Sequence, residues 1–176
     1  MIGNLGIIAH HLGNYNEAQV NYERALSLYR EVGYRQGEST VLSYLSLLFH
    51  HLGDHLAAKD YGFRALALAE ELEDSLSQGF ALTNIGHAFL GLGQLDEATG
   101  AYQRAVGIRR EAGQPNLAME SLAGLLEVGM AQASPACAWL YVEQILEHLK
   151  TYTLEGTIEP FRVYWTCYRM LRTHQD

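Results

Sequence analysis

The chain repeats itself every 40 residues, and this regularity limits its fold more than any other feature. Segments 4–31, 44–71 and 84–111 align without a gap. The shared positions are Leu12-Gly13, Leu52-Gly53 and Leu92-Gly93; Ala18, Ala58 and Ala98; Arg24-Ala25, Arg64-Ala65 and Arg104-Ala105; and Glu31, Glu71 and Glu111. Copies of one small unit bury their apolar faces by stacking on their neighbours, so the repeat predicts an elongated array.

Each unit has the pattern of two helices. In the second unit Leu42, Leu45 and Leu48 follow the three- and four-residue spacing of one helical face. The glycine after each repeated leucine is expected to end the first helix, because glycine tolerates the left-handed cap conformation. Small alanines and tyrosines then share one face of a second helix. The sequence therefore predicts an all-α chain of antiparallel helix pairs.

At these positions the chain resembles the tetratricopeptide repeat (TPR) family. The residues that carry the resemblance are Leu5-Gly6, Ala9, Gly13, Ala18, Tyr22 and Ala25 in the first unit and Ile85-Gly86, Phe89, Gly93, Ala98, Tyr102 and Ala105 in the third. The second unit departs from the pattern at Ser46 and Gly62. The usual TPR period is 34 residues. The 40-residue period resembles the arrays of kinesin light chains, LGN/Pins-type adaptors and bacterial regulators.

The resemblance implies a right-handed α-solenoid, the TPR superhelix, with about nine helices in one domain over residues 1–176. The expected units are 1–34, 35–74, 75–114 and 115–154, followed by a final helix at 157–173 capped by Thr157. We expect the apolar stripe of that helix to be Phe161, Tyr164, Trp165, Tyr168 and Leu171. The first unit lacks an opening turn, so the chain is expected to be a fragment of a longer array.

The resemblance further implies that the first helix of each pair lines a concave groove, which binds a peptide. The candidate groove residues are Asn4, Ile7, His10, His11, Ser43, Tyr44, Leu47, His50, His51, Phe80, Thr83, Asn84, His87 and Glu127. Asn4 and Asn84 are the first candidates, because a side-chain amide can both donate to and accept from a peptide backbone. The alternative is that these amides bond a neighbouring helix or water.

Five of the eight histidines fall near the expected groove. Imidazole binds zinc, copper or nickel, so a histidine metal site is one alternative, although no second motif completes a ligand set. The other interpretation is that these side chains are solvated or contact the peptide. Their protonation near pH 6 would then make binding depend on pH.

Charge and motifs exclude several classes of function. The net charge of −8 and the lack of a basic run argue against nucleic-acid binding. No apolar stretch approaches the roughly 20 residues of a membrane-spanning helix, and no secretory signal is recognisable. Phosphate-binding loops, GxSxG and HExxH are missing, so no enzyme activity and no cofactor are expected. Cys137 and Cys167 are expected to be buried in a reduced, cytoplasmic protein.

These observations predict a non-enzymatic module for protein–protein interaction. It would bind a protein or peptide segment in the concave groove, as a scaffold or as the sensor part of a larger signalling regulator. The alternative is structural self-assembly, in which open solenoid ends stack or exchange helices to form a homo-oligomer. Light scattering distinguishes the two, because a monomer of about 20 kDa favours groove binding alone.

Overall fold

The computed structural model describes residues 2–173, and the regular structure there is entirely helical. Met1 and residues 174–176 of the expected domain lie outside the described residues. The helices are α1 (Ile2–His11), α2 (Tyr15–Glu31), α3 (Arg35–His51), α4 (His55–Glu71), α5 (Ser75–Gly91), α6 (Leu95–Glu111), α7 (Pro115–Ala131), α8 (Pro135–Leu149) and α9 (Pro160–Thr173). The prediction of an all-α solenoid is confirmed.

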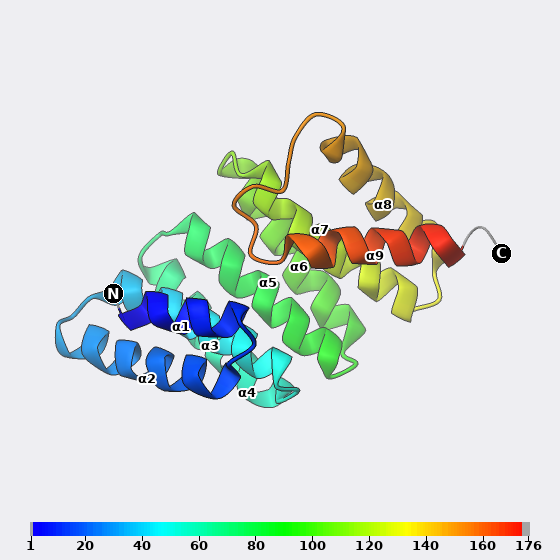
Figure 1. Cartoon of the computed structure of the whole chain (residues 1–176). Coiled ribbons are helices and arrows are strands. Elements are labelled where there is room, and N and C mark those ends of the chain that lie inside the picture. The colour runs from blue at the N-terminus through cyan, green and yellow to red at the C-terminus, as the bar shows by residue number, and fades with distance from the viewer. Residues whose placement is uncertain (1, 174–176) are drawn as a thin grey trace.

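Helices α1 to α8 form four antiparallel pairs that stack side by side along the molecule (Figure 1). The first helices of consecutive pairs contact one another, as α1 with α3, α3 with α5, and α5 with α7. Over residues 2–173 no such contact joins the consecutive second helices α2, α4, α6 and α8. The stack therefore curves with the first helices on its inner side, which is the concave face.

The turns between helices repeat the same backbone conformation. In each turn from α1 to α8, the second residue after the helix end has a positive φ, which only glycine adopts without steric cost. Gly13, Gly33, Gly53, Gly93 and Gly113 fill this position with φ between 70° and 80°, and Glu73 and Ala133 take it at 52° and 50°. Helices α4 and α5 also have a side-chain cap, since Asp54 accepts from the Ala57 amide and Asp74 from those of Leu76 and Ser77.

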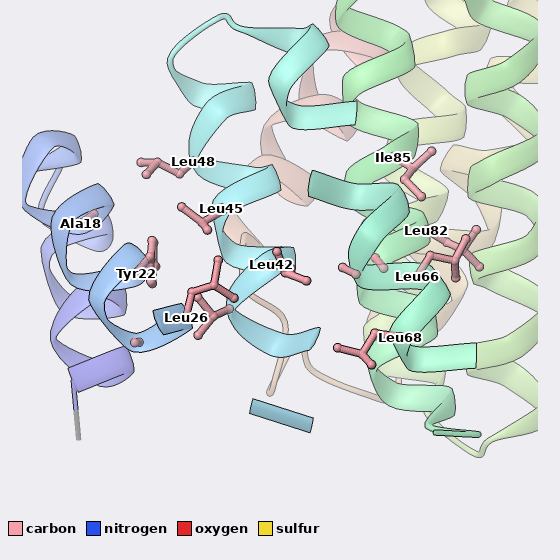
Figure 2. Packing of buried hydrophobic residues seen from close by; sticks show 14 of the residues in the cluster. Ala18, Tyr22, Leu26, Leu42, Leu45, Leu48, Leu66, Leu68, Leu82 and Ile85 are labelled. Atoms are coloured by element: carbon pink, nitrogen blue, oxygen red, sulfur yellow. The ribbon is translucent and has the colours of Figure 1, made fainter. Parts of the chain in front are cut away.

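One continuous hydrophobic core joins the helices of the first three units. Figure 2 shows Leu45 and Leu48 of α3 directed towards α2, which carries Tyr22 and Leu26. Leucines on the other side of α3 and on α4 continue this packing towards α5. Burying a leucine contributes about 2 kcal/mol, so each interface between units stabilises both of its neighbours.

A pairing between glycine and tyrosine explains why the second unit departs from the repeat. The ring of Tyr22 lies so close to Gly6 that an added Cβ would be 2.5 Å from ring atoms, and Tyr102 lies in the same way over Gly86. In the second unit Gly62 supplies no ring, so Ser46 has room for its side chain. The Ser46 hydroxyl donates to the carbonyl of Ala58 at 2.7 Å. The two departures therefore compensate each other.

The C-terminal segment differs from the expectation. Helix α9 begins at Pro160 rather than at residue 157, and it lies across α7 and α8 on the concave side (Figure 1). Its buried side chains are Val163, Thr166, Cys167 and Met170. The predicted aromatic stripe points outward instead, with Phe161 75% exposed, and the rings of Phe161, Trp165 and Tyr168 stack along the surface.

Candidate functional site

The loop before α9 binds the concave face through its backbone. The amides of Ile158 and Glu159 both donate to Oε1 of Glu120 on α7, and the Glu159 bond measures 2.8 Å. Burial raises the pKa of Glu120, and the Glu159 amide and Arg109 act against that rise. A carboxylate that accepts two backbone amides holds an extended segment whatever its side chains are. The concave face here therefore grips a stretch of chain.

A second set of polar contacts fixes the first turns of α9. Arg162 donates to Oε2 of Glu127 at 2.7 Å, and Thr166 donates to Oε1 of the same carboxylate at 2.8 Å. Burial by itself would lower the pKa of Arg162, but the charge of Glu127 outweighs it and the pKa is raised. Each partner of the ion pair keeps only about a fifth of its side chain exposed. We call Glu120, Glu127 and their partners the α9 latch.

His87 joins the α9 latch to the core. Arg162 can only donate, so Nε2 of His87 accepts at 3.1 Å, and its Nδ1 then carries the proton towards the Tyr102 hydroxyl at 2.6 Å. Burial lowers the pKa of His87 well below the usual value, and the nearby Arg162 charge lowers it further. His87 is therefore neutral at physiological pH and links α5, α6 and α9.

Two more histidines connect α1, α3 and the loop before α9. The Glu159 carboxylate accepts from Nε2 of His51 at 3.0 Å, and Nδ1 of His51 lies 2.8 Å from Nε2 of His10, within hydrogen-bond distance. Nδ1 of His10 forms a hydrogen bond with the Tyr22 hydroxyl at 3.3 Å. Burial, together with repulsion from His51 and His11, lowers the pKa of His10 to about 4.

These buried histidines make stability fall with acidity. Burial also lowers the pKa of His50 to about 4, with Arg162 and its histidine neighbours adding to the effect. The unfolded chain binds protons near pH 6.5 while the folded chain does not, so stability is complete above pH 6.5 and is lost towards pH 4. Each such group contributes up to about 1.4 kcal/mol per pH unit in this window.

We therefore expect the free energy of unfolding to drop between pH 6.5 and 5, and the drop to be smaller in His10→Gln. Urea unfolding at pH 7.5, 6.5 and 5 measures it. The neighbouring His11→Gln, at an exposed position, serves as the comparison: it removes only one of the charges that act on His10, so it should change the slope less than His10→Gln does. A wild-type stability that stays constant from pH 7.5 to 5 would contradict neutral, buried histidines.

The suggestion that His10, His50 and His87 protonate near pH 6 in the folded chain is wrong, because the pKa of each lies well below that pH.

One cavity gathers several predicted groove residues. It has a volume of about 290 Å³ and lies between α1, α3 and the start of α9. Its lining includes His10, His11, Tyr44, Leu47 and His51 from the predicted set. The other residues that line it are Tyr15, Tyr22, Ile158, Glu159, Pro160, Phe161 and Arg162. Tyrosine, histidine and phenylalanine rings therefore share the wall with aliphatic and charged side chains. We call this space the groove cavity.

Other predicted residues lie elsewhere. Asn84 is buried, and its Nδ2 donates to the carbonyl of Ser43 on α3 at 2.8 Å, so the amide ties two helices together. Ser43 and Thr83 are buried as well, and the Thr83 hydroxyl bonds that of Ser121 at 2.8 Å. Asn4 is exposed and Ile7 is partly buried on α1. Replacing Asn84 would consequently weaken the core besides any effect on binding.

The remaining predicted residues lie on α3, α5 and α7. His50 and His87 lie ring to ring with centroids 5.3 Å apart. Glu127 is committed to the α9 latch, and Phe80 packs its ring edge-on against Tyr44 at 5.2 Å. The expected groove of four open units is thus filled by the chain itself at its α7 end.

Sequence reasoning missed Glu159, Arg162 and Arg109. The only available signal for the first two was a charged pair at the start of the last helix, and its partners come from α3, α5 and α7, far away in sequence. Cys137 is exposed, contrary to expectation, whereas Cys167 is buried and burial raises its pKa to about 11.

Two other structural features bear on the alternatives. Within the described part of the chain no three His, Cys, Asp or Glu side chains are arranged to hold a metal ion. None of the helices in residues 2–173 has both the length and the apolar character that crossing a bilayer requires.

Comparison with known families places the fold. Two tetratricopeptide-repeat profiles match residues 1–71 and 81–112, which together make up more than half of the chain. The chain belongs to the tetratricopeptide-repeat proteins. No curated protein matches it in sequence.

Solved structures agree at the level of the fold. BtubC (BKLC) from P. vanneervenii has a TM-score of 0.76 and 19% identity, over 99% of this chain and 73% of that one. A Rap protein complexed with Competence and Sporulation Factor has a TM-score of 0.81 and 16% identity, over 99% of this chain and 52% of that one. A putative kinesin light chain with TPR-like repeats from P. anserina has a TM-score of 0.70 and 16% identity, over 99% of this chain and 91% of that one. The chain thus spans about half the length of the Rap protein.

Proposed function

We propose that the chain is a non-enzymatic interaction module that binds a segment of another protein in the groove cavity. The observation that carries this proposal is the position of the cavity: it opens on the concave face between α1, α3 and the start of α9. The aromatic rings in its wall offer large apolar surfaces with polar tips, which suit recognition of a peptide.

The concave face already holds one segment, which belongs to the chain itself. Glu120 grips the backbone of the loop before α9, while Glu127 grips Arg162 and Thr166. An extended stretch followed by a helix is therefore a form of ligand that these first helices can accommodate. A partner segment in the groove cavity would lie beside the start of α9 and touch Phe161, which is largely exposed.

The comparisons support the general part of the proposal. The tetratricopeptide-repeat fold is one of protein–protein interaction, and one similar structure is that of a Rap protein complexed with a factor. The role as a scaffold or as the sensor of a larger regulator, in the cytoplasm, extends this proposal. Asn4, Ile7 and His11 remain candidate contacts at the open α1 end of the groove.

Selection from a library of random peptides displayed on phage tests the proposal. We expect selected peptides to bind the wild-type chain and to lose at least about tenfold in affinity with Phe161→Asp, because a charge would then face the apolar part of the ligand. Leu56→Asp is the matched control: Leu56 is also exposed and apolar, but it lies on α4, away from the cavity. Equal losses in both variants would place binding elsewhere.

Self-assembly remains a second candidate because of one observation. Leu5 and Ile8 on α1 and Leu12 just after it expose more than half of their surface. An apolar face of this kind can pair with another copy of the chain.

A further inference from the structure

Arg109 on α6 is a buried cation without a direct partner. The residue is 2% exposed, and its guanidinium makes no hydrogen bond or ion pair with any residue in 2–173. Its Nε is shielded from solvent and unpaired. Burial lowers the pKa of Arg109 and the charge of Glu120 raises it, yet a guanidinium remains ionised at neutral pH. An unpaired buried charge costs free energy, so its presence needs a reason.

The repeat does not require an arginine at this position. Tyr29 and Ala69 occupy the equivalent places in the two preceding units. The neighbouring helix α5 makes room for Arg109 with Gly79, where an added Cβ would lie 2.9 Å from both Cγ and Nε of the arginine. The arginine side chain therefore passes over the bare backbone of Gly79 towards the concave side of the stack.

Arg109 contributes to the wall of a second cavity, which has a volume of about 220 Å³. Its walls come from α3, α5, α7 and the loop before α9, and they are mainly the apolar surfaces of Tyr44, Phe80, Leu117 and Ile158. This volume is several times the ~30 Å³ that one water occupies, and it is small for a ligand pocket. A cavity of this size holds one small organic molecule.

Glu120 is the acidic group nearest to this cation, and it does not neutralise it by contact. Its Oε1 accepts from the amides of Ile158 and Glu159, and no ion pair of 4.0 Å or less joins Glu120 to Arg109. Glu120 itself lines the cavity, together with Thr40 and Ser77. The cavity thus combines apolar walls with the Arg109 cation and with a carboxylate whose Oε1 is already bonded to two backbone amides. Arginine matches a carboxylate through two parallel hydrogen bonds.

We propose that this cavity binds a small organic acid, with its carboxylate on the Arg109 guanidinium and its apolar part between Tyr44, Phe80 and Leu117. The site is separate from the proposed peptide site, although Tyr44 and Ile158 line both cavities. Occupation of one cavity would therefore be felt in the other through these two shared side chains.

Calorimetric titration of the full chain with phenylacetate tests the proposal, and phenylacetamide provides a neutral ligand of the same shape. We expect saturable binding of phenylacetate at one site, and at least about tenfold weaker binding of phenylacetamide. Arg109→Gln should weaken phenylacetate binding at least about tenfold. Arg104→Gln, at an exposed position on the same helix, should leave it unchanged.

Gly79→Ala provides a second variant that keeps the cation but displaces it, and it should weaken phenylacetate binding as well. Circular dichroism shows whether each variant is folded. Three results would overturn the proposal: equal binding of the acid and the amide, wild-type affinity in both folded variants, or no saturable binding of phenylacetate, benzoate or hexanoate up to about 10 mM.

Discussion

Replacing Gly124 with alanine is expected to lower the free energy of unfolding by about 3 kcal/mol. A Cβ at Gly124 would lie 2.3 Å from Cζ of Tyr102, and the opposite side of that ring is closed by Gly86, where an added Cβ would lie at 2.4 Å. Tyr102 is completely buried and its hydroxyl is bonded to His87, so the ring has nowhere to move. The added methyl group would therefore disturb the packing of α5 and α7 against Tyr102 on α6.

Gly100→Ala is the matched control for this prediction. Gly100 lies on α6 with nothing within 4 Å of an added Cβ, so the same substitution should stabilise the chain by about 1 kcal/mol through higher helix propensity. Urea unfolding followed by circular dichroism measures both variants. If Gly124→Ala also proved stabilising, the close packing of Tyr102 between α5 and α7 would be wrong.

The α9 latch gives the second large effect. Glu127→Ala leaves Arg162 without its carboxylate and Thr166 without its acceptor. Removing one partner of a buried ion pair costs about 3–5 kcal/mol, and we expect about 2–3 kcal/mol because both side chains remain partly exposed. Helix α9 should then leave the concave face more often, and its amides should exchange with deuterium about 30- to 150-fold faster.

Mass spectrometry after deuterium exchange measures this effect on the peptides that cover α9. Glu147→Ala is the control, because the Glu147–Lys150 pair on α8 is exposed and contributes little. Adding Arg162→Met to Glu127→Ala should restore part of the protection by removing the unpaired charge. Unchanged exchange of α9 in Glu127→Ala would show that the latch does not hold the helix in place.

The stacking of the first three units could be predicted from the sequence, because the units share most of their core residues at the same spacing. Gly6 with Tyr22 and Gly86 with Tyr102 are such repeated pairs, and so are the glycines at the helix ends. The contact of Gly124 with Tyr102 could not be predicted, since it joins one unit to the next where the pattern weakens.

The placement of α9 could not be predicted, because two stripes at helical spacing compete in its sequence. The aromatic stripe of Phe161, Trp165 and Tyr168 has the larger apolar surface, yet the stripe that begins at Val163 is buried. The buried stripe is slimmer, and it lies on the side from which Arg162 and Thr166 reach Glu127. Long-range polar contacts therefore decided which face of α9 is covered.

Some of the predicted groove residues line a cavity, whereas others are covered by the C-terminal segment. Transfer from the family identified first-helix positions, and His10, His11, Tyr44, Leu47 and His51 do line one cavity. Whether a position is open depends on what covers it, however, and a non-repeated segment covers Glu127 and His87. A pattern within the repeats carries no information about that segment.

We expect a ligand to bind the concave face beside α1 and α3, next to α9. Photo-cross-linking of a selected peptide with a benzophenone at its centre tests this claim most directly. We predict cross-links to α1, α3 and residues 158–162, and their loss in Phe161→Asp. Cross-links confined to the outer helices α2, α4 and α6 would contradict the claim.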